Sequence, residues 1–97
     1  MNGNILVVIW FILHMAKQKD AHTVKQIENL AKKLRKLRKE KGYTNYETFA
    51  FDHNIPRAQY GRYEKGSDIR FSSLLKVLKA LDISLSEFFS SGFDEND

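Results

Sequence analysis

Regularly spaced apolar residues predict a long amphipathic helix in the first half of the chain. From Thr23 onward, apolar residues recur every three or four positions while lysines fill the opposite side, at Val24, Ile27, Leu30, Leu34 and Leu37. Thr23 and Gln26 form a capping box that predicts the first turn. Gly42 follows a last turn rich in Lys and Arg, so we expect the helix to end there.

Two short helices are predicted next, separated by a tight turn. Thr44 or Asn45 caps the first of them. Asn54 tolerates left-handed backbone geometry, and Pro56 suits the first turn of the second helix, which runs to about Lys65. About three residues join the two helices, a spacing typical of a helix-turn-helix. The inward positions of the first short helix are Tyr46, Phe49, Ala50 and His53.

The second short helix has two contrasting faces. Tyr60 and Tyr63 are expected to face the core, and the other side carries small and cationic residues, namely Arg57, Ala58, Gln59, Gly61, Arg62 and Lys65. A slim cationic face can enter a DNA major groove. Gly61 costs about 1 kcal/mol relative to alanine inside a helix. We favour the interpretation that it removes bulk near DNA, and the alternative is close packing against another helix.

Two further helices are expected before the end of the chain. In FSSLLKVLKAL, residues 71–81, the apolar half consists of Phe71, Leu74, Leu75, Val77, Leu78 and Leu81. Asp82 interrupts this pattern, and Ser84 with Glu87 forms another capping box. The short helix that begins there is expected to bury Leu85, Phe88 and Phe89. The acidic tail is predicted to be disordered from Asp94.

An apolar run at residues 5–13 precedes these helices. It is shorter than the stretch of about 20 residues that spans a bilayer, and it lacks the flanks of a secretory signal. One interpretation is that translation starts at Met15 and the run is an upstream extension. The other is a strand or apolar arm that pairs two copies. The predicted domains are an extension at 1–22, a helix-turn-helix domain at 23–90 and an acidic tail at 91–97.

Composition narrows the function classes. The 97 residues include no cysteine and three histidines, so we expect one small domain without a metal, a cofactor or a disulfide. No catalytic constellation is visible, and an enzyme is not expected. Residues 17–41 carry ten Lys or Arg and three acids, whereas residues 82–97 carry five acids and no base. A basic half on a small domain indicates a polyanionic partner.

Residues 30–89 resemble the DNA-binding domain of the Cro and lambda-repressor-like family, the XRE-type helix-turn-helix proteins. The stretches that carry the resemblance are LRKLRKEKGYTN, FAFDHNIPRAQYGRYEKG and LLKVLKALDISLSEFF. Ala50 falls at the small residue where the two helices cross, and Asn54 falls at the usual turn glycine. The resemblance implies an all-α, compact five-helix domain whose third helix, about 56–65, enters the major groove.

The resemblance also implies roles for individual residues. Base contacts are expected from Arg57, Ala58, Gln59 and Arg62. Contacts to the DNA backbone are expected from Asn45, Tyr46, Lys65, Ser67 and Arg70. Arg38 and Glu64 occupy the positions of a structural ion pair that orients the recognition helix.

Three departures from the family pattern concern the second helix and the turn. One extra residue lies between Gly42 and Ala50, so Asn45 or Tyr46 could take the place of a common glutamine. Asp52 stands where leucine is common, and Phe51 is expected to shift inward in compensation. Pro56 replaces a Ser or Thr, which removes a side-chain cap and a backbone donor.

The sequence therefore predicts a cytoplasmic, sequence-specific regulator that binds double-stranded DNA as a homodimer. The pairing surface could be the last short helix, the start of the long helix or the apolar arm. The alternative is an antitoxin or accessory subunit whose main partner is another protein. RNA binding is disfavoured because the recognition face lacks exposed stacking aromatic residues, and no membrane partner is expected.

Overall fold

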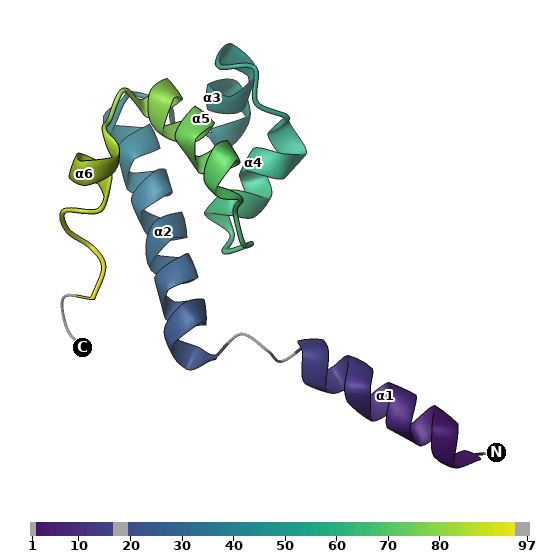
Figure 1. The fold of residues 1–97 in the computed structure, drawn as a ribbon. Helices are drawn as coiled ribbons and strands as arrows, with labels where there is room; N and C mark the ends of the chain where they lie inside the picture. Colours follow the sequence, from purple (N-terminus) through teal and green to yellow (C-terminus); the bar gives the residue numbers. More distant parts are fainter. Residues whose placement is uncertain (1, 17–19, 95–97) are drawn as a thin grey trace.

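The protein folds as a helical domain with one helix set apart from it. The computed structural model describes residues 2–16 and 20–94. Its elements are α1 Asn2–Ala16, α2 Ala21–Glu40, α3 Tyr46–Asp52, α4 Arg57–Glu64, α5 Phe71–Leu81 and α6 Leu85–Phe88. Helices α2 to α6 pack around one core, while α1 projects away from them (Figure 1). The predicted five-helix domain of the lambda-repressor kind is confirmed.

Helix α2 begins earlier than its apolar pattern predicts. Asp20 is the N-cap, and its carboxylate accepts a hydrogen bond of 2.7 Å from the backbone N–H of Thr23. This hydrogen bond lowers the pKa of Asp20. The predicted capping box is wrong, because Thr23 lies inside the helix and the Gln26 amide donates to Asp94 at 2.6 Å. The predicted end is confirmed, since Gly42 follows the helix with φ +103°.

The core is built from one stripe of each helix in the domain. Its fully buried large side chains are Leu34, Phe49, Tyr60, Val77 and Phe88. Because α3 and α4 both pack against α2, the buried rings of Phe49 and Tyr60 meet with centroids 5.1 Å apart. Of the inward positions predicted on α3, Phe49 and Ala50 are buried, whereas Tyr46 and His53 are only half-buried.

Several apolar residues expected in the core remain exposed. Phe51 does not shift inward and is 72% exposed, and Asp52 beside it accepts a hydrogen bond from the Tyr43 hydroxyl at 2.9 Å. A helix on the surface of a small domain buries one stripe, and the apolar residues outside that stripe face solvent. The expected burial is wrong for Leu85 and Phe89, and Phe71 and Leu75 on the apolar half of α5 are exposed as well.

Helix α1 is apolar on every side. The side chains of residues 5–11 are each between 48% and 66% exposed, although successive helical positions point about 100° apart. The strand alternative for this run is wrong, because the structure has a helix here. Among residues 2–16 and 20–94, no helix combines the length and the apolar character needed to cross a bilayer. The predicted disorder of the acidic tail falls mainly on residues 95–97, which lie outside the described residues.

Candidate nucleic-acid interface

The turn between α3 and α4 has the backbone geometry that its sequence predicts. Asn54 adopts left-handed geometry with φ +57°, and the buried Ile55 donates its backbone N–H to the Ala50 carbonyl at 2.9 Å. Pro56 is the N-cap of α4 and makes no side-chain cap. Asn45 is the N-cap of α3, where its side-chain oxygen accepts from Thr48 N–H at 2.9 Å, so the choice between Thr44 and Asn45 is resolved.

The back of α4 is fixed in the core. Tyr60 and Tyr63 are 0% and 6% exposed, which confirms their predicted core positions. The hydroxyl of Tyr63 accepts a hydrogen bond from the Gln59 amide. Gln59, a predicted base contact, is thus half-buried and already engaged within its own helix.

The front of α4 is open to solvent. Ala58, Arg62 and Lys65 recur at helical spacing and are exposed, and Arg57 at the start of the helix is exposed as well. The remaining predicted backbone contacts on the loop after α4 and at the cap of α3 are also exposed, namely Ser67, Arg70 and Asn45. The structure therefore presents a cationic helix face with the small residue Ala58 in its first turn.

Gly61 does not lie on this front. It is buried, and a Cβ atom built on it would lie 2.7 Å from Cε2 and 2.9 Å from Cζ of Tyr46. Its predicted place on the DNA-facing side is wrong, and close packing between helices explains the glycine instead. Tyr46, a predicted phosphate contact, is half-buried with its ring held against α4. This contact joins the start of α3 to the middle of α4.

Arg38 of α2 forms a buried ion pair with Glu64 at the end of α4. Arg38 and Glu64 are 5% and 4% exposed and form a bidentate ion pair, with Nε–Oε2 at 2.8 Å and Nη2–Oε1 at 2.9 Å. Arg38 also donates to the Tyr43 carbonyl at 2.9 Å. The hydrogen bonds to Glu64 raise the pKa of Arg38, so the guanidinium remains charged. A buried, fully bonded pair of this kind fixes the orientation of α4 relative to α2.

Sequence reasoning missed a second arginine in this arrangement. Arg35 donates a hydrogen bond to the backbone carbonyl of Glu64, one of the carbonyls left unpaired at the end of α4. The signal was present, because Arg35 lies three positions before Arg38 and therefore shares its helix face. Sequence reasoning also missed Lys33, which donates to the Ser91 carbonyl at 2.5 Å and ties α2 to the segment after α6.

Comparisons with known proteins agree with this geometry. The helix-turn-helix family profile matches residues 34–88, a span that contains α3, α4 and the paired arginine and glutamate. The chain is 41% identical over 59 residues to Control protein C.MunI of a Mycoplasma species, in an alignment that covers 60% of this chain and 80% of that protein. No solved structure matches the chain significantly.

The family match and the geometry of α3 and α4 indicate the same protein family. The profile covers more than half of the chain, and the relative is matched over most of its own length. The chain belongs to the XRE-type helix-turn-helix family and is a DNA-binding transcriptional regulator.

Proposed function

We propose that this regulator recognises a specific duplex sequence by placing α4 in the major groove. The observation that carries the proposal is the exposed front of α4, on which Arg57 and Arg62 are free of the core that holds Tyr60 and Tyr63. A major groove admits one α-helix, and arginine is the side chain that most often reads guanine through O6 and N7. We assign base reading to Arg57 and Arg62, with Ala58 as the close apolar contact.

Gln59 has a conditional role in this proposal. Its amide is engaged by the Tyr63 hydroxyl in the free protein, so reaching a base requires that hydrogen bond to be exchanged. We propose that Gln59 contributes less to discrimination than either arginine. When the base is changed, this amide can keep its internal hydrogen bond. The change therefore costs less binding free energy than it would for a side chain left without a partner.

The remaining predicted contacts surround the front and fit the DNA backbone. Lys65, Ser67 and Arg70 follow the end of α4 and are exposed, while Asn45 and Tyr46 lie at the start of α3. We propose that these residues bind phosphates, which fixes the register of α4 without reading sequence. The net charge of +4 favours such contacts.

We further propose that the regulator acts as a homodimer without enzymatic activity, in the cytoplasm. One helix reads only a few base pairs, and helix-turn-helix proteins gain specificity by pairing two half-sites about 34 to 36 Å apart. The family match supports a binding role rather than catalysis.

Selection of bound sites from random duplexes tests this proposal. The expected result is an enriched motif with two related halves, whose centres are separated by about one turn of the duplex. The same selection with the Arg62→Ala protein should lose one guanine preference per half and retain the rest. Recovery of no motif would contradict sequence-specific binding.

The second candidate function is that of an accessory subunit bound mainly to another protein. Helix α1 favours it, because this exposed apolar helix lies outside the residues that the family profile matches. A stoichiometric partner that binds α1 and abolishes DNA binding would support this function. DNA binding that is unchanged when the partner is bound to α1 would count against this function.

A further inference from the structure

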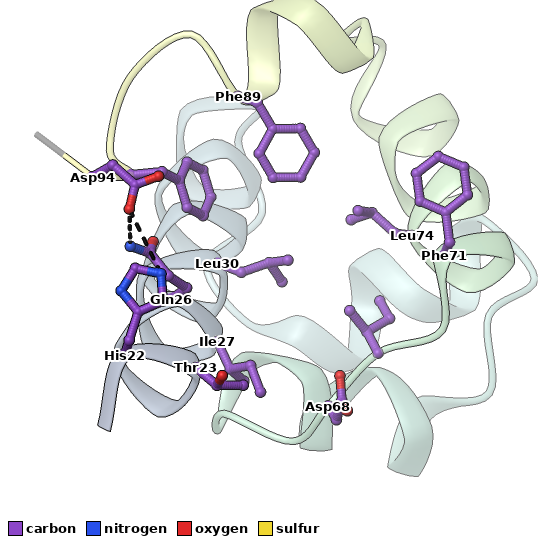
Figure 2. A pocket seen from close by; sticks show the side chains of 12 residues that line it. His22, Thr23, Gln26, Ile27, Leu30, Asp68, Phe71, Leu74, Phe89 and Asp94 are labelled. Atoms are coloured by element: carbon purple, nitrogen blue, oxygen red, sulfur yellow. Dashed lines mark hydrogen bonds and ion pairs between the residues drawn. The ribbon is translucent and has the colours of Figure 1, made fainter. Parts of the chain in front are cut away.

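An open apolar groove lies between α2, α5 and the segment after α6, and none of its lining residues belongs to α4. It has a volume of about 490 Å³ and runs between the first half of α2, the loop before α5, the start of α5 and the segment just after α6. Its apolar walls include Ile27, Leu30, Ile69, Phe71, Leu74 and Phe89. Figure 2 shows the labelled side chains of Ile27, Leu30, Leu74 and Phe89 directed toward the same space.

Polar contacts stabilise one edge of this groove and leave its floor uncovered. The Asp94 carboxylate accepts from the Gln26 amide at 2.6 Å and lies 4.0 Å from His22, so the segment after α6 is held against α2 (Figure 2). Phe89, beside this segment, is 45% exposed, and Phe71, across the groove on α5, is 60% exposed (Figure 2). A cluster of exposed large apolar residues in a concave surface is typical of an interaction site.

The same chain carries an apolar helix suited to such a groove. Helix α1 ends at Ala16 and α2 begins at Ala21, and the groove reaches His22 and Thr23 in the first turn of α2. Four positions, 17–20, therefore separate α1 from the α2 end of the groove. No charged side chain occurs among residues 5–13 of α1, which matches the apolar walls.

The pattern of α1 favours a partner copy over its own domain. A helix that is apolar on all sides is stable in water only when it is covered on more than one side. A groove covers one side of it, so α1 folded back onto its own domain would leave its other side exposed. In a pair of copies each α1 can lie in the groove of the other chain and pack its remaining side against the second α1, and two-fold symmetry makes each contact occur twice.

We propose that α1 of each copy docks in the groove formed by α2, α5 and the segment after α6 of a second copy. The occupant of the groove is then a segment of this same protein, exchanged between two chains. This inference rests on the dimer in the proposed function and names its interface. It does not involve the front of α4. The docking of α1 and base reading by α4 can therefore be refuted independently of each other.

Site-specific crosslinking tests the docking directly, because the chain contains no cysteine. One chain carries Phe71→Cys, and a second carries a single cysteine introduced at one of positions 5–11, each in turn. The two chains are mixed, oxidised and separated without reductant, and the joined peptides are identified by mass spectrometry. The expected result is a disulfide-linked pair of chains that joins residue 71 to α1.

Two results of this experiment would overturn the proposal. In the first, chains carrying both cysteines close into disulfide-linked monomers and mixed single-cysteine chains do not link, which would place α1 in its own groove. In the second, the protein is a dimer and residue 71 links to none of the positions on α1. Phe51→Cys is the matched control, because Phe51 is 72% exposed and does not line the groove.

Fluorescence of Trp10 gives an independent measurement, since it is the only tryptophan of the chain and is 62% exposed on α1. Its emission should shift to the blue as protein concentration rises through the dimerisation midpoint. Phe71→Asp should raise that midpoint about tenfold or more, and Phe51→Asp should leave it unchanged. Circular dichroism confirms that both variants fold. A blue shift that needs phosphatidylglycerol vesicles, in a chain that stays monomeric, would contradict the proposal in favour of a membrane surface.

Discussion

Arg38 and Glu64 show how a charged pair can determine the position of a reading helix. Both side chains are almost fully buried, and each guanidinium–carboxylate bond is shorter than 3 Å. Neither group can be removed alone without leaving the other buried and unpaired. Because both side chains are buried, we expect the pair to affect DNA binding through the orientation of α4.

Removing one partner of this pair should destabilise the fold strongly. We expect Glu64→Leu or Arg38→Met to lower the free energy of unfolding by about 3 to 5 kcal/mol, measured by urea denaturation. The double variant Arg38→Met with Glu64→Leu should recover a large part of that loss, because no charge is left buried. Losses in the double variant equal to the sum of the single losses would contradict this account.

Gly61 links packing to DNA affinity through Tyr46. In Gly61→Ala the new methyl group would overlap the Tyr46 ring, with built contacts of 2.7 and 2.9 Å. Since this ring is half-buried and alanine is the better helix former by about 1 kcal/mol, we expect a small change in stability. The displaced ring should weaken binding to all duplexes equally. Titration of selected and random duplexes checks this, and unchanged affinity for both would remove the proposed phosphate contact of Tyr46.

The buried hydroxyl of Tyr60 predicts a pH dependence. Among the described residues it has no partner at hydrogen-bond geometry, and burial followed by the nearby Glu64 carboxylate raises its pKa well above the usual value. The unfolded chain releases this proton above about pH 10 while the native state retains it, so stability is present below that pH and declines above it.

Tyr60→Phe should flatten this alkaline decline. At neutral pH its free energy of unfolding should stay within about 1 kcal/mol of the parent or exceed it, because an unpaired buried hydroxyl is removed. Urea denaturation at a series of pH values measures both effects. If the free energy of unfolding of this variant falls with pH as steeply as that of the parent protein, another group is responsible for the decline.

At the scale of elements, periodicity and caps predicted the helices better than their exposed faces. The helix-turn-helix pair follows from Asn45, Asn54 and the apolar spacing around them, and the structure confirms it. Helical spacing cannot tell Phe71 and Leu75 from Leu74 and Leu78, since all four lie on one apolar half of α5. Which of them are buried depends on the neighbouring helices of the domain.

The prediction for Gly61 failed for a related reason. Residue 61 lies at the boundary between the two faces of α4, and only the position of the Tyr46 ring shows which face includes it. Phe51 likewise remained exposed, and Asp52 beside it is also exposed and accepts a hydrogen bond from the Tyr43 hydroxyl. The assignments of base and phosphate contacts remain predictions.

The loop after α4 should control affinity without controlling sequence preference. Lys65 is exposed at the C-cap of α4, beside the turn at Gly66. We expect Lys65→Ala to weaken binding to selected and random duplexes by the same factor and to lower the salt slope by about 1. Binding measured at several salt concentrations checks this. A loss confined to the selected duplex would instead assign base reading to Lys65.

At the scale of the whole molecule, α4 and the apolar groove are proposed to bind different partners. The front of α4 faces DNA, while the groove between α2, α5 and the segment after α6 receives α1 of a second copy. Dimerisation then places two copies of α4 on one duplex, and the spacing of the half-sites reports the geometry of the pair. A protein that lost pairing should retain weak binding to a single half-site.

The most direct measurement of the central claim compares selected and random duplexes for Arg57→Ala and Arg62→Ala. Both side chains are exposed on α4, so neither substitution should alter the fold. The account predicts that each variant loses about 1 to 3 kcal/mol of discrimination between the two duplexes. Equal losses of affinity for both duplexes would contradict it, because the arginines would then bind phosphate and the front of α4 would not read the sequence.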